Sequence, residues 1–353
     1  MDANVFLPAL TAALAGLFFV ALIDQWRTRR RAYQAIWALG ILFFGLAVAC
    51  EALAAAAGWS EPVYRVWYLT GAVWTAGWLG LGNAFLLGRT RFGFAFALCL
   101  FFAGLFTFLT ARRNPEIYSD ASTTAMLYFL VAGVLALAVA VETYFQNWRW
   151  PWMALLAVGG ATILSVVLML MATLPPPGYA LDPATGVPTA AILPPELRLL
   201  TPFMNITGAF ALILGALFSA YVFMPKKRVL EYSLDPQQPG DQFLFNLLIA
   251  PVAILVNFAA SLPGALKALF TGRINSRVPA TLLIAAGAFV PTVTDSLNRF
   301  GSTEWFQVGK LLSVLFLLAG FLVSTETFSE IRVPFTHIVL RGRRAEPREA
   351  NGS

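Results

Sequence analysis

Residues 33–88 read YQAIWALGILFFGLAVACEALAAAAGWSEPVYRVWYLTGAVWTAGWLGLGNAFLLG. Two apolar runs, 33–58 and 63–88, are joined by the short polar turn WSEP at 59–62. Each run exceeds the ~20 residues that a helix needs to cross about 30 Å of hydrocarbon. The segment therefore predicts an antiparallel transmembrane hairpin.

The rest of the chain has the same character. Of its 353 residues, 59% are hydrophobic and 12% are charged, whereas a soluble domain typically carries about 25% charged residues. The charges are crowded into short gaps between apolar runs, as expected when the backbone crosses lipid as helices that satisfy their own hydrogen bonds. We predict an all-α, polytopic integral membrane helical bundle whose main surroundings are the lipid bilayer.

A seven-helix transmembrane module is expected over residues 1–228. Its loops divide by charge, because the loops on one side contain ten arginines and lysines and those on the other side contain four. By the positive-inside rule this places the N-terminus outside and the end of the seventh helix in the cytoplasm. The net charge of +6 then reports orientation and gives no reason to expect nucleic acid as a partner. The predicted spans are 5–23, 33–58, 63–88, 92–111, 123–146, 150–174 and 199–224.

The C-terminal third is harder to assign. A polar cytoplasmic linker is expected at 229–242, a C-terminal transmembrane hairpin at 278–330 and a basic tail at 331–353. Residues 243–277 lie between them, and their apolar part, 243–270, is interrupted by Pro251 and Pro263. If this segment is re-entrant or interfacial, the chain has about nine spans and the basic tail lies inside, as the charge rule favours. If it crosses the membrane, there are ten spans.

The longest loop, residues 175–198, contains PPPG at 175–178 and a second proline pair at 194–195. Proline prevents helix continuation and favours extended or turn conformations. On the predicted topology this loop is an outer flap over the bundle.

Polar side chains within the spans suggest a site, because a central charge costs roughly 2.5–3.5 kcal/mol on insertion scales. Counted from the outer end of each helix, five of them fall at comparable depth, and Trp74 adds an aromatic wall. They predict an outward-facing ligand pocket between the second, third and seventh helices. The alternative is that Glu51 bonds Arg65 or a nearby hydroxyl and only fixes helix packing. The proposed ligand-binding residues are Glu51, Arg65, Tyr68, Trp74, Asn205 and Thr207.

The third helix also carries two patterned faces. Trp67, Trp74 and Trp78 have the spacing of one helix face. This stripe could wall a site for an apolar ring such as a quinone, although packing is the commoner reason for such a pattern. Gly80, Ala84 and Gly88 form a small-residue ridge that predicts close helix contact.

The last hairpin offers a second polar pair. Asp295 lies just before its turn and Lys310 about two turns after it, so antiparallel helices could bring the two to similar depth. We expect either an ion pair or part of a proton or ion relay, and a structural salt bridge is the favoured reading.

Several chemistries have no support in the sequence. The sole histidine, His337, lies in the tail, which excludes a haem held by two histidines of one chain and argues against an intramembrane metal site. The motifs of phosphate loops, dinucleotide binding, zinc proteases and nucleophile elbows do not occur. We therefore predict a non-enzymatic protein without catalytic residues, cofactor or metal. Cys50 and Cys99 are expected to be free thiols because their predicted depths are too different for a disulfide.

Residues 24–92 carry WRTRRR at 26–31, WALG at 37–40, EAL at 51–53 and WYLTGA at 67–72. These runs, with seven spans and an outer N-terminus, make residues 1–228 resemble the seven-helix membrane sensor regions that precede bacterial histidine kinases. The chain departs from that pattern after residue 228, where further apolar segments stand in place of a kinase domain. The resemblance implies signal sensing in a bacterial inner membrane, with Glu51 on the ligand side.

The sequence thus favours a multi-pass cell-membrane protein that acts as a receptor-like or accessory module. It would bind a small or lipophilic ligand and pass a helix shift to a cytoplasmic or membrane protein partner. A transporter or channel, or a structural subunit of a larger membrane complex, is the alternative.

Overall fold

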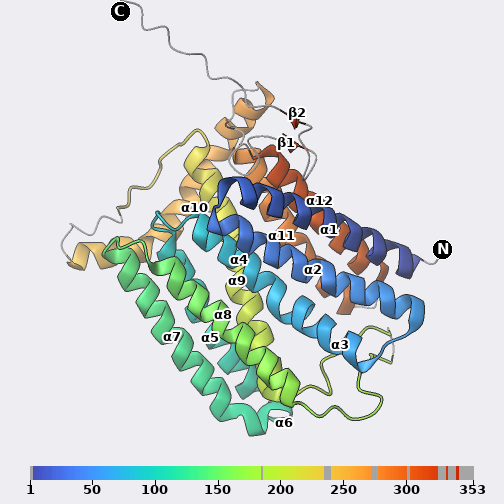
Figure 1. The fold of residues 1–353 in the computed structure, drawn as a ribbon. Coiled ribbons are helices and arrows are strands. Elements are labelled where there is room, and N and C mark those ends of the chain that lie inside the picture. Colours follow the sequence, from blue (N-terminus) through green and yellow to red (C-terminus); the bar gives the residue numbers. More distant parts are fainter. Residues whose placement is uncertain are drawn as a thin grey trace, which may run out of the picture.

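The protein is an all-α polytopic bundle (Figure 1). The structure, a computed structural model, describes residues 3–183, 186–233, 240–271, 275, 277–299, 303–324, 331–332 and 339–341. Within these residues, eight helices are long and apolar enough to cross a membrane. The class predicted from the sequence is confirmed.

The described chain contains twelve α-helices, one short π-helix and one short 3-10 helix. The first half contains α1 (Ala3–Arg29), α2 (Ala32–Ala57), α3 (Glu61–Trp67), η1 (Tyr68–Trp74), α4 (Thr75–Leu86), α5 (Phe92–Arg113), α6 (Pro115–Tyr118), η2 (Ser119–Ala121) and α7 (Ser122–Tyr144). The second half contains α8 (Trp150–Met171), α9 (Pro195–Phe223), α10 (Gly240–Phe270), α11 (Arg277–Arg299), α12 (Thr303–Val323) and the strand pair β1 (Ile331–Arg332) and β2 (Val339–Arg341).

The long helices pack in a continuous series. Helix α1 lies against α2, α2 against α4, α4 against α9, α9 against α5, and α5 against α7, while α8 fills the space beside α4, α7 and α9. The C-terminal pair α11 and α12 closes this series from the other side, because α11 packs on α9 and α12 packs on α1. A buried cluster that includes Phe18, Trp37 and Phe321 joins the first helices to the last. The C-terminal hairpin is therefore part of the bundle.

Helices α4 and α9 approach each other at a glycine pair. A Cβ on Gly80 would overlap the carbonyl oxygen of Gly208, and a Cβ on Gly208 would overlap the carbonyl of Ala76. Small residues let two membrane helices bring their backbones together, where van der Waals contact stabilises them. The structure thus places Gly80 in a close helix contact of the kind its sequence pattern predicts.

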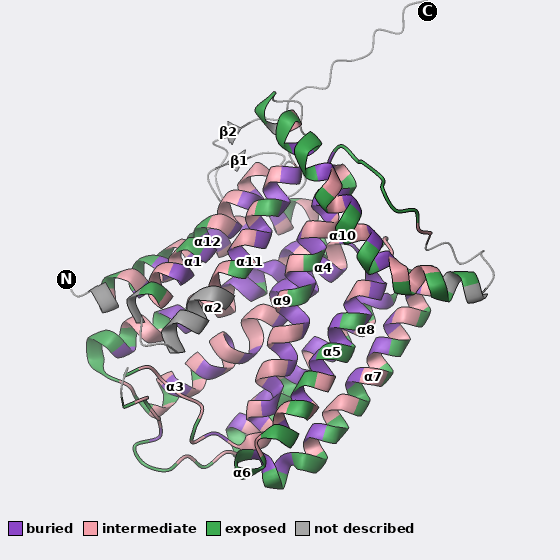
Figure 2. Cartoon of the chain, turned by 180° about the vertical axis from the view of Figure 1, so that it is seen from behind, coloured by how far each residue is buried: buried purple, intermediate pink, exposed green. Residues whose placement is uncertain are grey.

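Exposed residues lie along the outer faces of the long helices (Figure 2), and many of them are large and apolar. On α7, apolar side chains that are 43–67% exposed recur every three or four residues. A water-soluble protein rarely exposes so long an apolar stripe, whereas a helix facing lipid requires one. These residues are Leu127, Leu130, Val134, Leu137 and Val141.

Helix α10 has a different orientation from its neighbours. In Figures 1 and 2 it runs across the direction of the other long helices, along the end of the bundle where α9 finishes. Its Ile254, Phe258 and Ala265 pack on Tyr221 and Met224 at that end. Length and apolarity alone would count α10 as a span, so its course across the bundle is information that composition does not supply.

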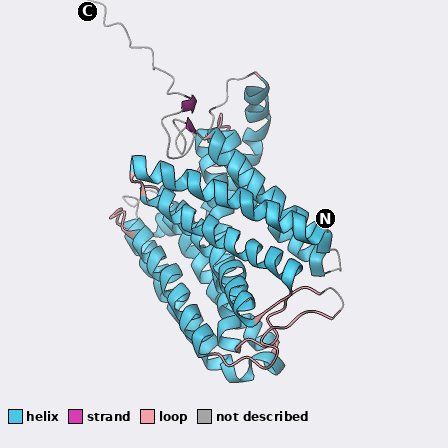
Figure 3. Ribbon diagram, turned by 45° about the vertical axis from the view of Figure 1, so that its right-hand side comes forward, coloured by secondary structure: helices cyan, strands magenta, loops and turns pink. Residues whose placement is uncertain are grey.

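The loop between α8 and α9 covers the opposite end (Figure 3). Its described part includes the buried Leu193 and the partly buried Tyr179 and Ile192, which pack against the main core. The Tyr64 hydroxyl donates a hydrogen bond to the Thr189 carbonyl. The predicted flap is thus packed onto α3.

The glycine contact gives a first test. We expect Gly80→Ala to lower the free energy of unfolding by about 1–3 kcal/mol, because the added methyl must displace the backbone of α9. Thermal unfolding of the purified protein in detergent measures the effect. Gly133→Ala is the matched control, because a Cβ on Gly133 meets nothing within 4 Å; equal stability of the two variants would contradict the contact.

Candidate functional site

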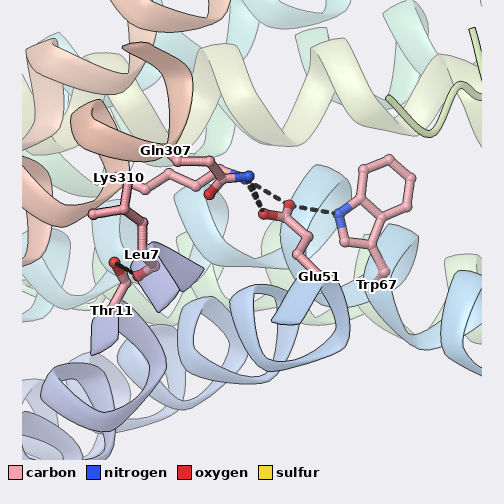
Figure 4. Close-up of polar contacts among 6 residues, drawn as sticks. All are labelled: Leu7, Thr11, Glu51, Trp67, Gln307 and Lys310. Carbon is pink, nitrogen blue, oxygen red and sulfur yellow. Dashed lines mark hydrogen bonds and ion pairs between the residues drawn. The ribbon is translucent and has the colours of Figure 1, made fainter. Parts of the chain in front are cut away.

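Four polar side chains from three helices meet between α2, α3 and α12 (Figure 4). Lys310 Nζ lies 2.5 Å from both carboxylate oxygens of Glu51. Gln307 Nε2 donates to Glu51 Oε2 at 3.0 Å, and Trp67 Nε1 donates to Glu51 Oε1 at 2.9 Å. We call these residues, Glu51, Trp67, Gln307 and Lys310, the Glu51 cluster.

The Glu51 cluster is largely shielded from its surroundings. The side chains of Glu51 and Lys310 are each 11% exposed, and Lys310 Nζ also lies 3.9 Å from the centre of the Phe306 ring. Each charge is expensive in an apolar medium by itself, whereas paired and hydrogen-bonded charges offset each other's desolvation. Loss of either partner would leave an uncompensated charge between helices.

Local geometry explains how α12 supplies two of these groups. Gln307 and Lys310 are three residues apart, so they project from the same face of the helix. That face is turned toward α2, and Ser313, one turn further on, donates instead to the Gly287 carbonyl of α11 at 2.6 Å. Helix α12 therefore uses polar side chains to join both neighbours.

A π-helix begins immediately after Trp67. Segment η1 spans Tyr68–Trp74, and Thr75 N–H reaches back five residues to the Thr70 carbonyl. The Thr75 hydroxyl donates to the same carbonyl at 2.7 Å, and Asn205 Nδ2 of α9 donates to the Ala72 carbonyl at 3.1 Å. Such segments are rare and frequently mark functional sites. In η1, two side chains thus donate hydrogen bonds to backbone carbonyls of the π-helix.

The π-helix also separates the three tryptophans. Trp67 bonds Glu51, whereas Trp74 Nε1 donates to Ser165 at 2.8 Å and Trp78 Nε1 to Thr162 at 3.1 Å, both on α8. The prediction of a single stripe assumed α-helical spacing throughout, and η1 interrupts that spacing.

Arg65 is directed away from Glu51 and toward the end of α8. Its guanidinium pairs with Glu61 at 2.7 Å and donates to the carbonyls of Met169 and Ala172, the latter at 2.7 Å. A cation that bonds the last carbonyls of a helix satisfies acceptors without an intrahelical partner and complements the helix dipole. Arg65 thus fastens α3 to α8.

Tyr68 and Thr207, which were also predicted to bind the ligand, lie outside the Glu51 cluster. The Tyr68 hydroxyl shares a 2.7 Å hydrogen bond with Thr201 of α9. Thr207 Oγ1 is buried and has no hydrogen-bond partner among the described residues.

The structure therefore brings together Glu51 and Lys310, which the sequence assigned to two separate sites, and distributes Arg65, Tyr68, Trp74 and Asn205 over contacts with α8, α9 and η1. Asp295, the partner expected for Lys310, has its side chain outside the described residues. Gln307 was not predicted, although its position three residues before Lys310 is a signal that the sequence contains. Cys50 and Cys99 are free, as predicted, and Cys50 is only partly buried.

No family model matches the chain, and neither does any curated protein or solved structure. The fold and exposed apolar surface define a multi-pass membrane protein.

A double-mutant cycle tests the central pair. Glu51→Gln or Lys310→Met alone should destabilise the protein by about 3–5 kcal/mol, because the remaining charge is left unpaired in a site where both side chains are only 11% exposed. The double variant should recover most of the loss, so the two effects should not add. Unfolding in detergent is the measurement, with Glu116→Gln at an exposed carboxylate as control. Simple additivity would exclude a functional pairing of the two charges.

Proposed function

We propose that the protein is a non-enzymatic, receptor-like or accessory membrane module. It binds a small or lipophilic ligand between α2, α3 and α9. The site lies at the end of the bundle that the loop of residues 172–194 covers. The observation that carries this proposal is the Glu51 cluster, which joins α12 to α2 and α3 directly beside a π-helix. A ligand that competes for Glu51 changes the contact between the hairpin and the rest of the bundle.

A shift of α12 can be passed to the far end of the bundle through helix packing. Helix α12 packs on α11, and α11 packs on α9, whose last residues lie at the far end of the bundle against α10. A ligand shifts a conformational equilibrium only by its difference in affinity for the two states. Glu51 supports that difference, because its carboxylate is shared by Lys310, Gln307 and Trp67 and each of these bonds can be exchanged.

The covering loop supports the same location. Trp59, Tyr64 and Trp67 contact one another as an aromatic group at the start of α3, and the loop is bonded to Tyr64. Aromatic walls with a few polar groups are typical of sites for small apolar ligands. A quinone or sterol-like ring suits these surroundings.

The proposal includes the orientation of the protein in the membrane. We place the N-terminus outside and the ends of α1, α7 and α9 in the cytoplasm of a bacterial inner membrane, as the loop arginines favour. Residues 1–228 form the sensing module and the α11–α12 hairpin its helical extension. The resemblance of residues 1–228 to histidine-kinase sensor regions supports this assignment, with a cytoplasmic or membrane protein as recipient of the signal.

Ligand binding is tested with short-chain quinone and cholesterol as separate probes in thermal-shift measurements. We expect at least one probe to raise the melting temperature of the wild type, because a ligand at 100 times its Kd adds about 2.7 kcal/mol. The shift should disappear in Glu51→Gln and persist in Glu116→Gln. An equal shift in all three proteins would place the ligand elsewhere, and selective flux through reconstituted liposomes would favour a transporter.

The orientation is tested by cysteine labelling. In a Cys50→Ala/Cys99→Ala background, Arg113→Cys should react with a membrane-impermeant maleimide on intact cells, because its loop is expected outside. Arg31→Cys should react only after permeabilisation. Both arginines are exposed, so accessibility is decided by the side of the membrane; labelling of Arg31→Cys in intact cells would overturn the layout.

A further inference from the structure

We propose that a second site, at the end of the bundle remote from the Glu51 cluster, binds a phosphate group through Arg91, Lys226 and Arg228. This inference does not rest on the proposed receptor function. The three cations line one cavity of about 770 Å³ between the start of α5, the end of α9 and the chain that follows it. Among the described residues that line this cavity, Glu231 is the one carboxylate, so three cations there exceed one anion by two charges.

The three cations form no ion pair with another side chain among the described residues. Arg91 Nη1 is buried and has no hydrogen-bond partner there, which is costly for a charged donor. Lys226 Nζ lies 5.8 Å from the centre of the Tyr221 ring. Lys226 and Arg228 are both exposed, and neither forms an ion pair among the described residues. Two guanidinium groups that line one cavity are a donor set that can bind a phosphate in bidentate fashion.

Helix α10 holds the segment that carries Arg228. Asn257 Oδ1 accepts from Val229 N–H at 2.7 Å and from Leu230 N–H at 2.9 Å, and Asn257 Nδ2 donates to the Leu230 carbonyl at 2.8 Å. Ser261 Oγ accepts from Lys227 N–H at 2.9 Å. Two buried polar residues of α10 thus fix the backbone of residues 227–230, which lowers the backbone ordering cost of binding at Arg228.

Neutral donors complete the lining. Tyr221 and Tyr232 both face the cavity. Burial raises the pKa of Tyr232, the neighbouring Tyr221 raises it further, and Arg228 lowers it. The net effect is upward, so this phenol keeps its proton at physiological pH and can donate it in a hydrogen bond to an anion.

The surroundings favour the phosphate of a lipid headgroup over a soluble phosphate. Helix α10 buries Ala253, Asn257 and Ser261 against the protein and turns apolar side chains outward, among them Leu248 at 78% and Leu255 at 64% exposure. An exposed apolar helix face beside a cationic cavity has the properties of an interfacial helix that contacts acyl chains while basic residues hold anionic headgroups.

Native mass spectrometry of the full chain in detergent tests the site. The probes are phosphatidylglycerol, phosphatidylcholine and inorganic phosphate, offered to the wild type, to Arg91→Gln/Arg228→Gln and to Arg113→Gln, an exposed arginine outside the cavity. We expect selective retention of phosphatidylglycerol by the wild type and by Arg113→Gln. Affinity should fall about tenfold for each cavity cation removed, the scale of one charge-assisted hydrogen bond.

Each outcome has a defined meaning. Phosphatidylglycerol that excess inorganic phosphate does not displace assigns the site to a lipid headgroup. Inorganic phosphate that displaces the lipid, and raises the melting temperature of the wild type but not of the double variant, assigns it to a soluble phosphate compound. Equal binding of every probe by the wild type and a folded double variant overturns the proposal; circular dichroism establishes that the variant is folded.

Discussion

Two opposite charges, 259 residues apart in the chain, meet between α2 and α12. Neither could be left alone among apolar helices, because an unpaired charge there costs several kcal/mol. Their pairing therefore constrains where the last hairpin can lie. With α12 packed on α1 and bonded to Glu51 of α2, its partner α11 packs on α9. Residues that follow the seven-helix part of the sequence thus become part of the same bundle.

The π-helix is the local adjustment that accompanies this pairing. An α-helix from Glu61 to Leu86 would present Trp67, Trp74 and Trp78 on one face. The seven π-helical residues let Trp67 donate to Glu51 while Trp74 and Trp78 donate to α8. Asn205 and Thr75 then satisfy the carbonyls whose pattern is altered. The π-helical backbone is thus bonded by two polar side chains, of which Asn205 is one that the sequence suggested for ligand binding.

The sequence predicts the helices better than their partners, for a physical reason. Apolar length specifies a span, and the Gly80 ridge specifies a close contact, because both properties are local. The partner of Glu51 is not local: Arg65 and Asp295 are near in sequence to Glu51 and Lys310 respectively, yet Arg65 bonds the end of α8. Similarly, α10 has the composition of a span, but its Asn257 and Ser261 bond the backbone of residues 227–230, and its composition does not reveal these partners.

Charged residues at the two ends of the bundle differ in whether other side chains and carbonyls bond them. Around Glu51 and Arg65, charged groups are matched by carbonyls, carboxylate or amide donors from other helices. Around Arg91 and Arg228 the described residues supply no such match, although α10 holds the Arg228 segment in place. Lys226 and Arg228 are exposed, but the buried Arg91 Nη1 belongs to the same cavity and has no hydrogen-bond partner among the described residues. The phosphate group that we propose for this cavity would supply that partner.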